Sequence, residues 1–227
     1  MYCDDLRKIL PVYKEIYYAK GNCTIHEPSL ESKVKEITWY NADFQVLSTD
    51  IAKDLTRFFQ SAKSGDIFCF NCDGVFLFQG DRKKYMFLCE LKSTFDSSDV
   101  YHACNQITST YIKLSMILNL LPNFNMDDVI VKGFIISRPP LNSYLRDLYK
   151  QSMFGNNKKK FTTEAEFCLN LCYNNSEQSF MMKFKQCHQF KDIPLGSETI
   201  VDGIEFHHIS VEEPNTSITV DVMQYAS

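Results

Sequence analysis

The sequence predicts an α/β domain in which helices flank a mixed central sheet, and two observations support this fold class. Apolar residues recur at helical spacing in several segments, most clearly after Ser97. Short apolar runs bounded by turn residues, such as Tyr85–Ser93 and Asp128–Ser137, are typical of strands. The segments follow one another as helices, hairpin, helix, strand, helix and a last group of strands, which favours one sheet covered by helices.

Three helices are expected before the hairpin. Residues 1–20 carry apolar side chains at helical spacing among charged ones, and a second helix is predicted over residues 28–40. The third, Thr49–Lys63, has Thr49 as a suitable N-cap and an apolar stripe along one side. The polar residues 64–66 interrupt this pattern and separate the helix from the first strand of the hairpin.

The hairpin is predicted to consist of the strands Ile67–Phe78 and Tyr85–Ser93, joined by Gln79–Lys84. A long helix should then run from Ser97 to the residue before Pro122. The remaining expected elements are the strand Asp128–Ser137, the helix Leu141–Phe154 and the strands Ala165–Tyr173, Ser179–Phe184, Thr199–Ile209 and Ile218–Met223. We expect all of them to belong to a single domain over residues 1–227.

The composition limits the classes of protein to which the chain can belong. The 227 residues are 44% hydrophobic and 23% charged, which is typical of a globular chain that buries a substantial core. The formal net charge of -4 does not indicate a strongly basic nucleic-acid-binding protein. Any surface that binds nucleic acid must therefore be a local patch, or must be assembled by oligomerisation or with a partner protein.

Nine cysteines, an odd number, lie mostly in apolar stretches, where a free cysteine acts as a small hydrophobic residue. The first residues are amphipathic and charged, unlike a secretory signal. No apolar run approaches the ~20 residues that span a bilayer. We therefore expect a reduced, soluble, cytoplasmic protein without a membrane partner.

Two acidic residues stand in the strongest strand-forming region, Asp73 in the first strand and Glu90 in the second. If the turn of the hairpin centres between Asp81 and Arg82, Asp73 lies directly opposite Glu90 on one face of the sheet. Lys92 follows Glu90 on the same face, because side chains alternate along a strand. This register places two carboxylates side by side with an ammonium group two residues away.

Like charges opposed in a sheet are destabilising and need compensation. One carboxyl group can be protonated, Lys92 can partly neutralise the pair, or both acids can hold a divalent cation. Mg²⁺ suits the third arrangement, since it is commonly bound by one or two carboxylates, with water and phosphate completing its shell. The lysine would then activate a water molecule or stabilise negative charge on phosphorus.

Asp73, the hairpin and the run Glu90-Leu91-Lys92 resemble the signature of the PD-(D/E)xK nuclease superfamily, which has the restriction-endonuclease-like fold. The resemblance covers residues 49–154, with 155–227 as a C-terminal β-rich extension of the same domain. It implies a metal-dependent endonuclease with Mg²⁺ or Mn²⁺ bound by Asp73, Glu90 and the carbonyl of Leu91, and with Lys92 as the catalytic lysine. It also implies DNA, rather than RNA, as the substrate, and suggests a role in bacterial antiviral defence or restriction.

Several other residues are candidate accessories to this site. Members of the superfamily often add a glutamate from an upstream helix, for which Glu31 and Glu36 are the candidates. Gln106 shares the polar face of the helix after the hairpin with His102, Thr110 and Lys113, and this face is a candidate to line the site. The basic loop that contains Lys158, Lys159 and Lys160 is a candidate phosphate contact.

Two alternatives remain open at this stage. A nuclease-like fold that has lost catalysis would act as a binding or scaffold subunit of a larger complex. A structural zinc site is the other, with Cys69, Cys72, Cys168, Cys172 and Cys187-His188 as its potential ligands. Cys69 and Cys72 would point to opposite faces of a strand, which disfavours zinc. The adjacent pair His207-His208 also points apart and is expected to be structural.

Overall fold

The structure is a computed structural model that describes residues 2–60, 68–154, 163–173, 179–184 and 200–226, together with Phe190, Ile193 and Gly196. Lys158, Lys159 and Lys160 lie outside the described residues, as do Cys187 and His188. None of the described helices is long and apolar enough to cross a membrane.

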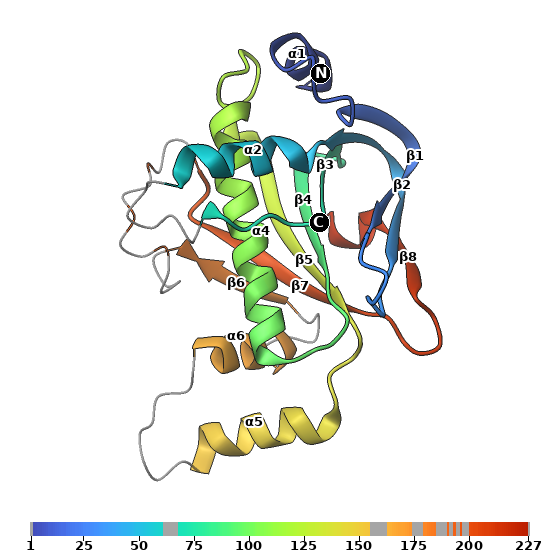
Figure 1. The fold of residues 1–227 in the computed structure, drawn as a ribbon, viewed down its shortest axis with the longest axis vertical. Helices are drawn as coiled ribbons and strands as arrows, with labels where there is room; N and C mark the ends of the chain where they lie inside the picture. Colours follow the sequence, from blue (N-terminus) through green and yellow to red (C-terminus); the bar gives the residue numbers. More distant parts are fainter. Residues whose placement is uncertain are drawn as a thin grey trace.

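The described residues form one mixed sheet of eight strands (Figure 1). The strands are β1 (Tyr17–His26), β2 (Glu36–Leu47), β3 (Gly74–Gln79), β4 (Lys84–Leu91), β5 (Val129–Ser137), β6 (Ser179–Lys183), β7 (Gly203–Ser210) and β8 (Ser217–Asp221). Their order is β1-β2-β3-β4-β5-β7-β6, and β8 pairs with β2 outside this path. Neighbouring strands from β1 to β4 are antiparallel, whereas β4, β5 and β7 run parallel to one another.

Five helices occur in the described part of the chain: α1 (Tyr2–Ile9), α2 (Thr49–Phe59), α4 (Ser97–Leu118), α5 (Asn142–Phe154) and α6 (Thr163–Tyr173). The short 3-10 helices η1 (Met126–Asp128) and η3 (Val222–Tyr225) complete the elements. Helix α4 connects the parallel strands β4 and β5, as such a crossover requires. It lies across one face of the sheet, with α2 in front of the same face (Figure 1).

The sheet separates two hydrophobic cores. The first contains Val75, Leu77, Met86 and Leu88 from the hairpin and is covered by α4, α2, α1 and α6. The second, on the opposite face, is rich in aromatic residues and centres on the buried Trp39 of β2. These two cores fix which side chains of the hairpin face the helices, because a shift of one residue in register would exchange the faces.

The sheet curls around the second core. The ring of Trp39 on β2 lies 4.8 Å from that of Phe134 on β5, although β3 and β4 separate the two strands in the sheet. A bulge at Asn41, which has a φ of 76°, divides β2 into a half that pairs with β8 and a half that pairs with β3. The bend places β1 and the end of β2 beside the start of β3, where Asp73 lies.

Several predicted elements are confirmed, and others are wrong. The helices predicted from Thr49, Ser97 and Leu141 are present, and so are the hairpin and the strand after Asp128. Both helix predictions are wrong beyond α1: residues 11–16 form turns, 17–20 belong to β1, 28–35 form a loop and 36–40 belong to β2. Ile37 and Trp39 are two residues apart and both buried, as on one face of a strand. The strand predicted from Ile67 begins only at Gly74.

The segment Ala165–Tyr173 is part of helix α6 rather than a strand. Its buried residues are Ala165, Phe167, Cys168 and Leu171, a spacing that places them on one side of a helix. A short apolar run does not by itself separate a strand from a helix, which explains the wrong prediction. The later strands are present, and β7 pairs with β5, so the C-terminal segment belongs to the main sheet.

Candidate active site

The turn of the hairpin sets the register expected from the sequence. Gln79 pairs with Lys84 and Gly74 pairs with Cys89, so that Asp73 and Glu90 are the next opposed positions. The Asp73 backbone N–H donates to the carbonyl of Cys89 at 3.0 Å. The Leu91 N–H donates to Asp73 Oδ2 at 2.7 Å. The structure therefore brings the two acids together at the same end of the hairpin.

Lys92 bridges the end of β4 and helix α4. Its Nζ donates to Glu90 Oε1 at 2.8 Å and to Gln106 Oε1 at 2.7 Å. The side chain of Glu90 is 3% exposed and that of Lys92 is 17% exposed, so the lysine lies at the solvent edge of the pair. Gln106 in turn donates from Nε2 to the carbonyl of Asn71 at 2.9 Å. Helix α4 thus holds both the lysine and the chain just before Asp73.

Burial raises the pKa of both acids. Burial is the largest cause for Asp73, whose pKa is raised to about 6, and the Leu91 N–H partly opposes this shift. Burial followed by the charge of Asp73 raises the pKa of Glu90 to about 8, and Lys92 opposes it incompletely. The site therefore lacks enough positive charge to keep both acids ionised at neutral pH.

Glu27 is a third acid close enough for its charge to raise the pKa of both Asp73 and Glu90. It directly follows β1, and its Oε1 accepts a hydrogen bond from the Ser29 N–H at 2.8 Å. Neither predicted upstream glutamate has this position, since Glu31 is exposed and Glu36 pairs with His26 at 3.1 Å. Sequence reasoning missed Glu27 because β1 was not expected; the alternation of buried Cys23 and Ile25 is the signal that indicates a strand ending there.

The polar face of α4 fixes the segment that leads into Asp73. Thr110 Oγ1 accepts from the Cys72 N–H at 2.8 Å. Lys113 is fully buried, and its Nζ lies within hydrogen-bond distance, 2.7–3.0 Å, of four oxygens that share its three N–H donors: Thr56 Oγ1, the carbonyls of Phe68 and Phe70, and Asn71 Oδ1. Burial lowers the pKa of Lys113 to about 8. This lysine is therefore an internal cation that holds residues 68–71 in place through hydrogen bonds to their oxygens.

Asp73, Glu90 and the Leu91 carbonyl are the candidate ligands of a divalent cation at this site. No three His, Cys, Asp or Glu side chains among the described residues are grouped so as to hold a metal. However, Glu90 Oε2 is buried without a hydrogen-bond partner in the described part of the chain. The Leu91 carbonyl points toward the Asp73 side of β4, because its N–H does so in an extended strand. Two carboxylates and a carbonyl fit Mg²⁺, which keeps several waters.

The zinc ligands suggested by the sequence do not come together among the described residues. Cys69 is exposed whereas Cys72 is buried, and Cys168 and Cys172 lie on helix α6. His207 and His208 are buried on opposite faces of β7, as expected for structural residues. His208 lies 2.9 Å from Ser137 Oγ, and the ring of His207 stacks on Phe134.

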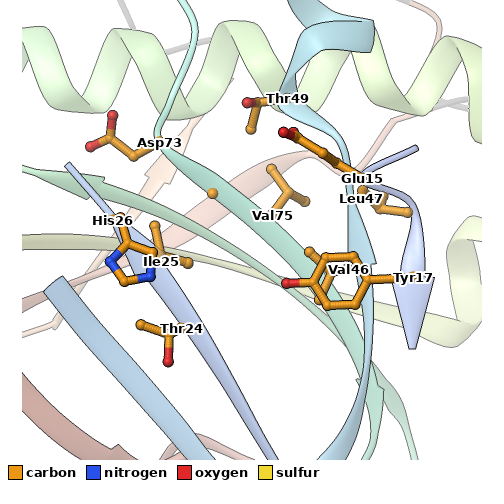
Figure 2. A pocket seen from close by; sticks show the side chains of 11 residues that line it. Glu15, Tyr17, Thr24, Ile25, His26, Val46, Leu47, Thr49, Asp73 and Val75 are labelled. Carbon is orange, nitrogen blue, oxygen red and sulfur yellow. The ribbon is translucent and has the colours of Figure 1, made fainter. Parts of the chain in front are cut away.

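A pocket of about 340 Å³ opens beside Asp73, between β1, the end of β2 and the start of β3 (Figure 2). Its polar lining residues are Glu15, Tyr17, Thr24, His26, Thr49 and Asp73, and its apolar ones are Ile25, Val46, Leu47, Gly74 and Val75. Asp73 therefore belongs both to this pocket and to the pair of acids on the hairpin.

Comparisons with known proteins give no family for this chain. No protein-family model, no curated protein and no solved structure matches it.

Proposed function

We propose that this protein is a divalent-metal-dependent nuclease that hydrolyses phosphodiester bonds at the site formed by Asp73, Glu90 and Lys92. The observation that carries the proposal is the convergence of the buried Glu90 and the half-buried Asp73, both with raised pKa values, beside a lysine 2.8 Å from Glu90. The proposal includes a restriction-endonuclease-like core around the hairpin and α4, DNA as the substrate, and a cytoplasmic role in bacterial defence.

Asp73, Glu90 and the carbonyl of Leu91 would hold Mg²⁺ or Mn²⁺. When bound, the cation supplies positive charge to the scissile phosphate and lowers the pKa of a water molecule. Glu90 Oε2, which has no partner among the described residues, is the oxygen available to it, while Oε1 keeps Lys92 in place. Both acids, whose pKa values burial raises, would be held in their ionised forms by such a cation.

Lys92 orients the attacking water or stabilises the charge that develops on phosphorus. Gln106 fixes the lysine through a 2.7 Å hydrogen bond, and it fixes Asn71 through its amide nitrogen. One residue thus couples the position of Lys92 to the segment that presents Asp73. Gln106 is accordingly a positioning residue, whereas Lys92 is a catalytic residue in this proposal.

The test is a cleavage assay with supercoiled plasmid and single-stranded DNA in Mg²⁺ or Mn²⁺. Wild type is compared with Asp73→Asn, Glu90→Gln and Lys92→Met, and Glu212→Gln on the exposed surface is the matched control. We expect the first three variants to lose cleavage by a factor of at least ~100, as for removal of a principal catalytic group, and the control to match wild type. Equal cleavage by all variants would exclude this site.

A catalytically inactive subunit with the same fold is the second candidate. The observation that favours it is the absence of a three-residue metal-ligand group among the described residues. This protein would bind nucleic acid, a second copy or a partner protein without cleaving. Binding of DNA with no cleavage in either metal, by wild type and all variants, would support this candidate over the nuclease.

A further inference from the structure

The pocket beside Asp73 has the size and the lining of a site for a small ligand. Its volume of about 340 Å³ is at the lower end of the ~300–1,000 Å³ range of ligand pockets, which suits a single small ring system rather than a duplex. Ile25, Val46 and Val75 provide apolar surface, and polar side chains surround it. In Figure 2, Asp73, Thr49 and Glu15 lie along one side of the pocket, and His26 and Tyr17 face each other across it.

The acidic side chains that line the pocket disfavour a phosphate group inside it. No lysine or arginine lines the pocket, whereas the acidic residues Glu15 and Asp73 both line it. The one basic group, His26, pairs with Glu36 at 3.1 Å. A ligand with N–H donors and no negative charge is therefore the chemical match for these acceptors.

Tyr17 supplies a flat surface to the lining of the pocket. The residue is 39% exposed, and burial is the largest cause that raises the pKa of its hydroxyl group. The phenol is neutral at physiological pH, as an ordinary tyrosine is. An exposed tyrosine ring next to hydrogen-bonding side chains is a common way for proteins to bind an unstacked base.

We infer that this pocket binds one unpaired nucleobase that carries an exocyclic amino group, next to the scissile phosphate. Tyr17 stacks on the base and Glu15 accepts from its amino group, which adenine, cytosine and guanine have and thymine lacks. Asp73 connects the pocket with the pair of acids, so the inference rests on the proposed function for its place in the reaction. It specifies the substrate as single-stranded DNA or DNA with an unpaired nucleotide.

The binding experiment uses short fluorescent oligo(dC), oligo(dA) and oligo(dT) strands with Ca²⁺ in place of Mg²⁺, followed by anisotropy. We expect wild type to bind oligo(dC) and oligo(dA) about tenfold more tightly than oligo(dT). Glu15→Ala should abolish this preference, and Tyr17→Leu should weaken all three by about tenfold. The matched controls are Glu212→Ala and Tyr40→Leu, since Tyr40 is equally exposed (43%) but does not line the pocket.

The outcomes separate this inference from the proposed function. Equal binding of the three strands, or a preference that survives Glu15→Ala, overturns the base pocket even if plasmid DNA is cleaved in Mg²⁺. A preference that Glu15→Ala removes supports the pocket even if no DNA is cleaved, in which case the nuclease proposal alone fails. If none of the three strands binds, the base pocket is overturned. If the same protein preparations also fail to cleave DNA in Mg²⁺, the nuclease proposal fails as well.

Discussion

Replacing Glu90 by glutamine removes a buried charge with almost no change in side-chain volume. We expect Glu90→Gln to stabilise the protein in EDTA at alkaline pH. The carboxyl group has a pKa of about 8 when folded, against an ordinary value of 4.5, and burial is the main cause. At ~1.4 kcal/mol for each pH unit between these two values, ionising Glu90 costs the folded state on the order of 5 kcal/mol.

The sign follows from proton binding. Because the folded pKa is the higher one, folded Glu90 holds its proton between pH 4.5 and 8, whereas unfolded Glu90 releases it. The wild type therefore loses stability as the pH rises through this window, and Glu90→Gln does not. The free energy of unfolding is measured with urea at pH 5 and pH 9. The advantage of the variant should be small at pH 5 and should reach a few kcal/mol at pH 9.

Glu205→Gln is the matched control, since Glu205 also lies on a strand beside a lysine, with 3.0 Å between Lys132 Nζ and Glu205 Oε2. His207, whose Nε2 lies 3.5 Å from Glu205 Oε1, together with Lys132, lowers the pKa of Glu205 to about 2 despite partial burial. Its contribution to stability is present above pH 4.5 and is lost toward pH 2. The variant should therefore be destabilised at neutral pH. A loss of stability at pH 9 in Glu90→Gln like that in Glu205→Gln would refute the reasoning.

Three further predictions concern the surroundings of the site. Lys113→Met leaves buried oxygens of residues 68–71 without a donor and should lower the free energy of unfolding by at least ~2 kcal/mol in urea titrations. Gly133→Ala places a Cβ 2.8 Å from Phe206 and 3.0 Å from Ile107, and should cost ~1–3 kcal/mol by the same measurement. Gln106→Ala should reduce the cleavage rate about tenfold, because it releases both Lys92 and the segment before Asp73. A wild-type free energy of unfolding in either of the first two variants, or a wild-type cleavage rate in the third, would contradict the corresponding contact.

The hairpin was the most predictable part of the molecule. Its short loop leaves one register that buries Val75, Leu77, Met86 and Leu88 on a single face, and that register opposes Asp73 to Glu90. Helix α4 was equally clear from its apolar spacing and from the proline that follows it. The local sequence pattern and the tertiary packing agree in these segments, so the sequence alone was sufficient to predict them.

The region before Thr49 was much less predictable. Strands β1 and β2 pair across a bulge at Asn41, and β2 also pairs with β8, which is distant in the sequence. The burial of Trp39 depends on Phe134 of β5 and Tyr225 of η3, which are distant in the sequence. The proximity of Glu27 to Asp73 and the pocket lined by Glu15 and Tyr17 follow from this non-local pairing. The sequence therefore predicted the two acids and the lysine but not the residues that surround them.

Binding of Mn²⁺ tests the central claim most directly. Calorimetric titration of the wild-type protein at pH 8 should reveal one site, and Asp73→Asn and Glu90→Gln should each abolish it, while Lys92→Met and Glu212→Gln retain it. Unchanged Mn²⁺ binding in both acid variants, or no binding by the wild type, would contradict the assignment of these two carboxylates to a shared cation.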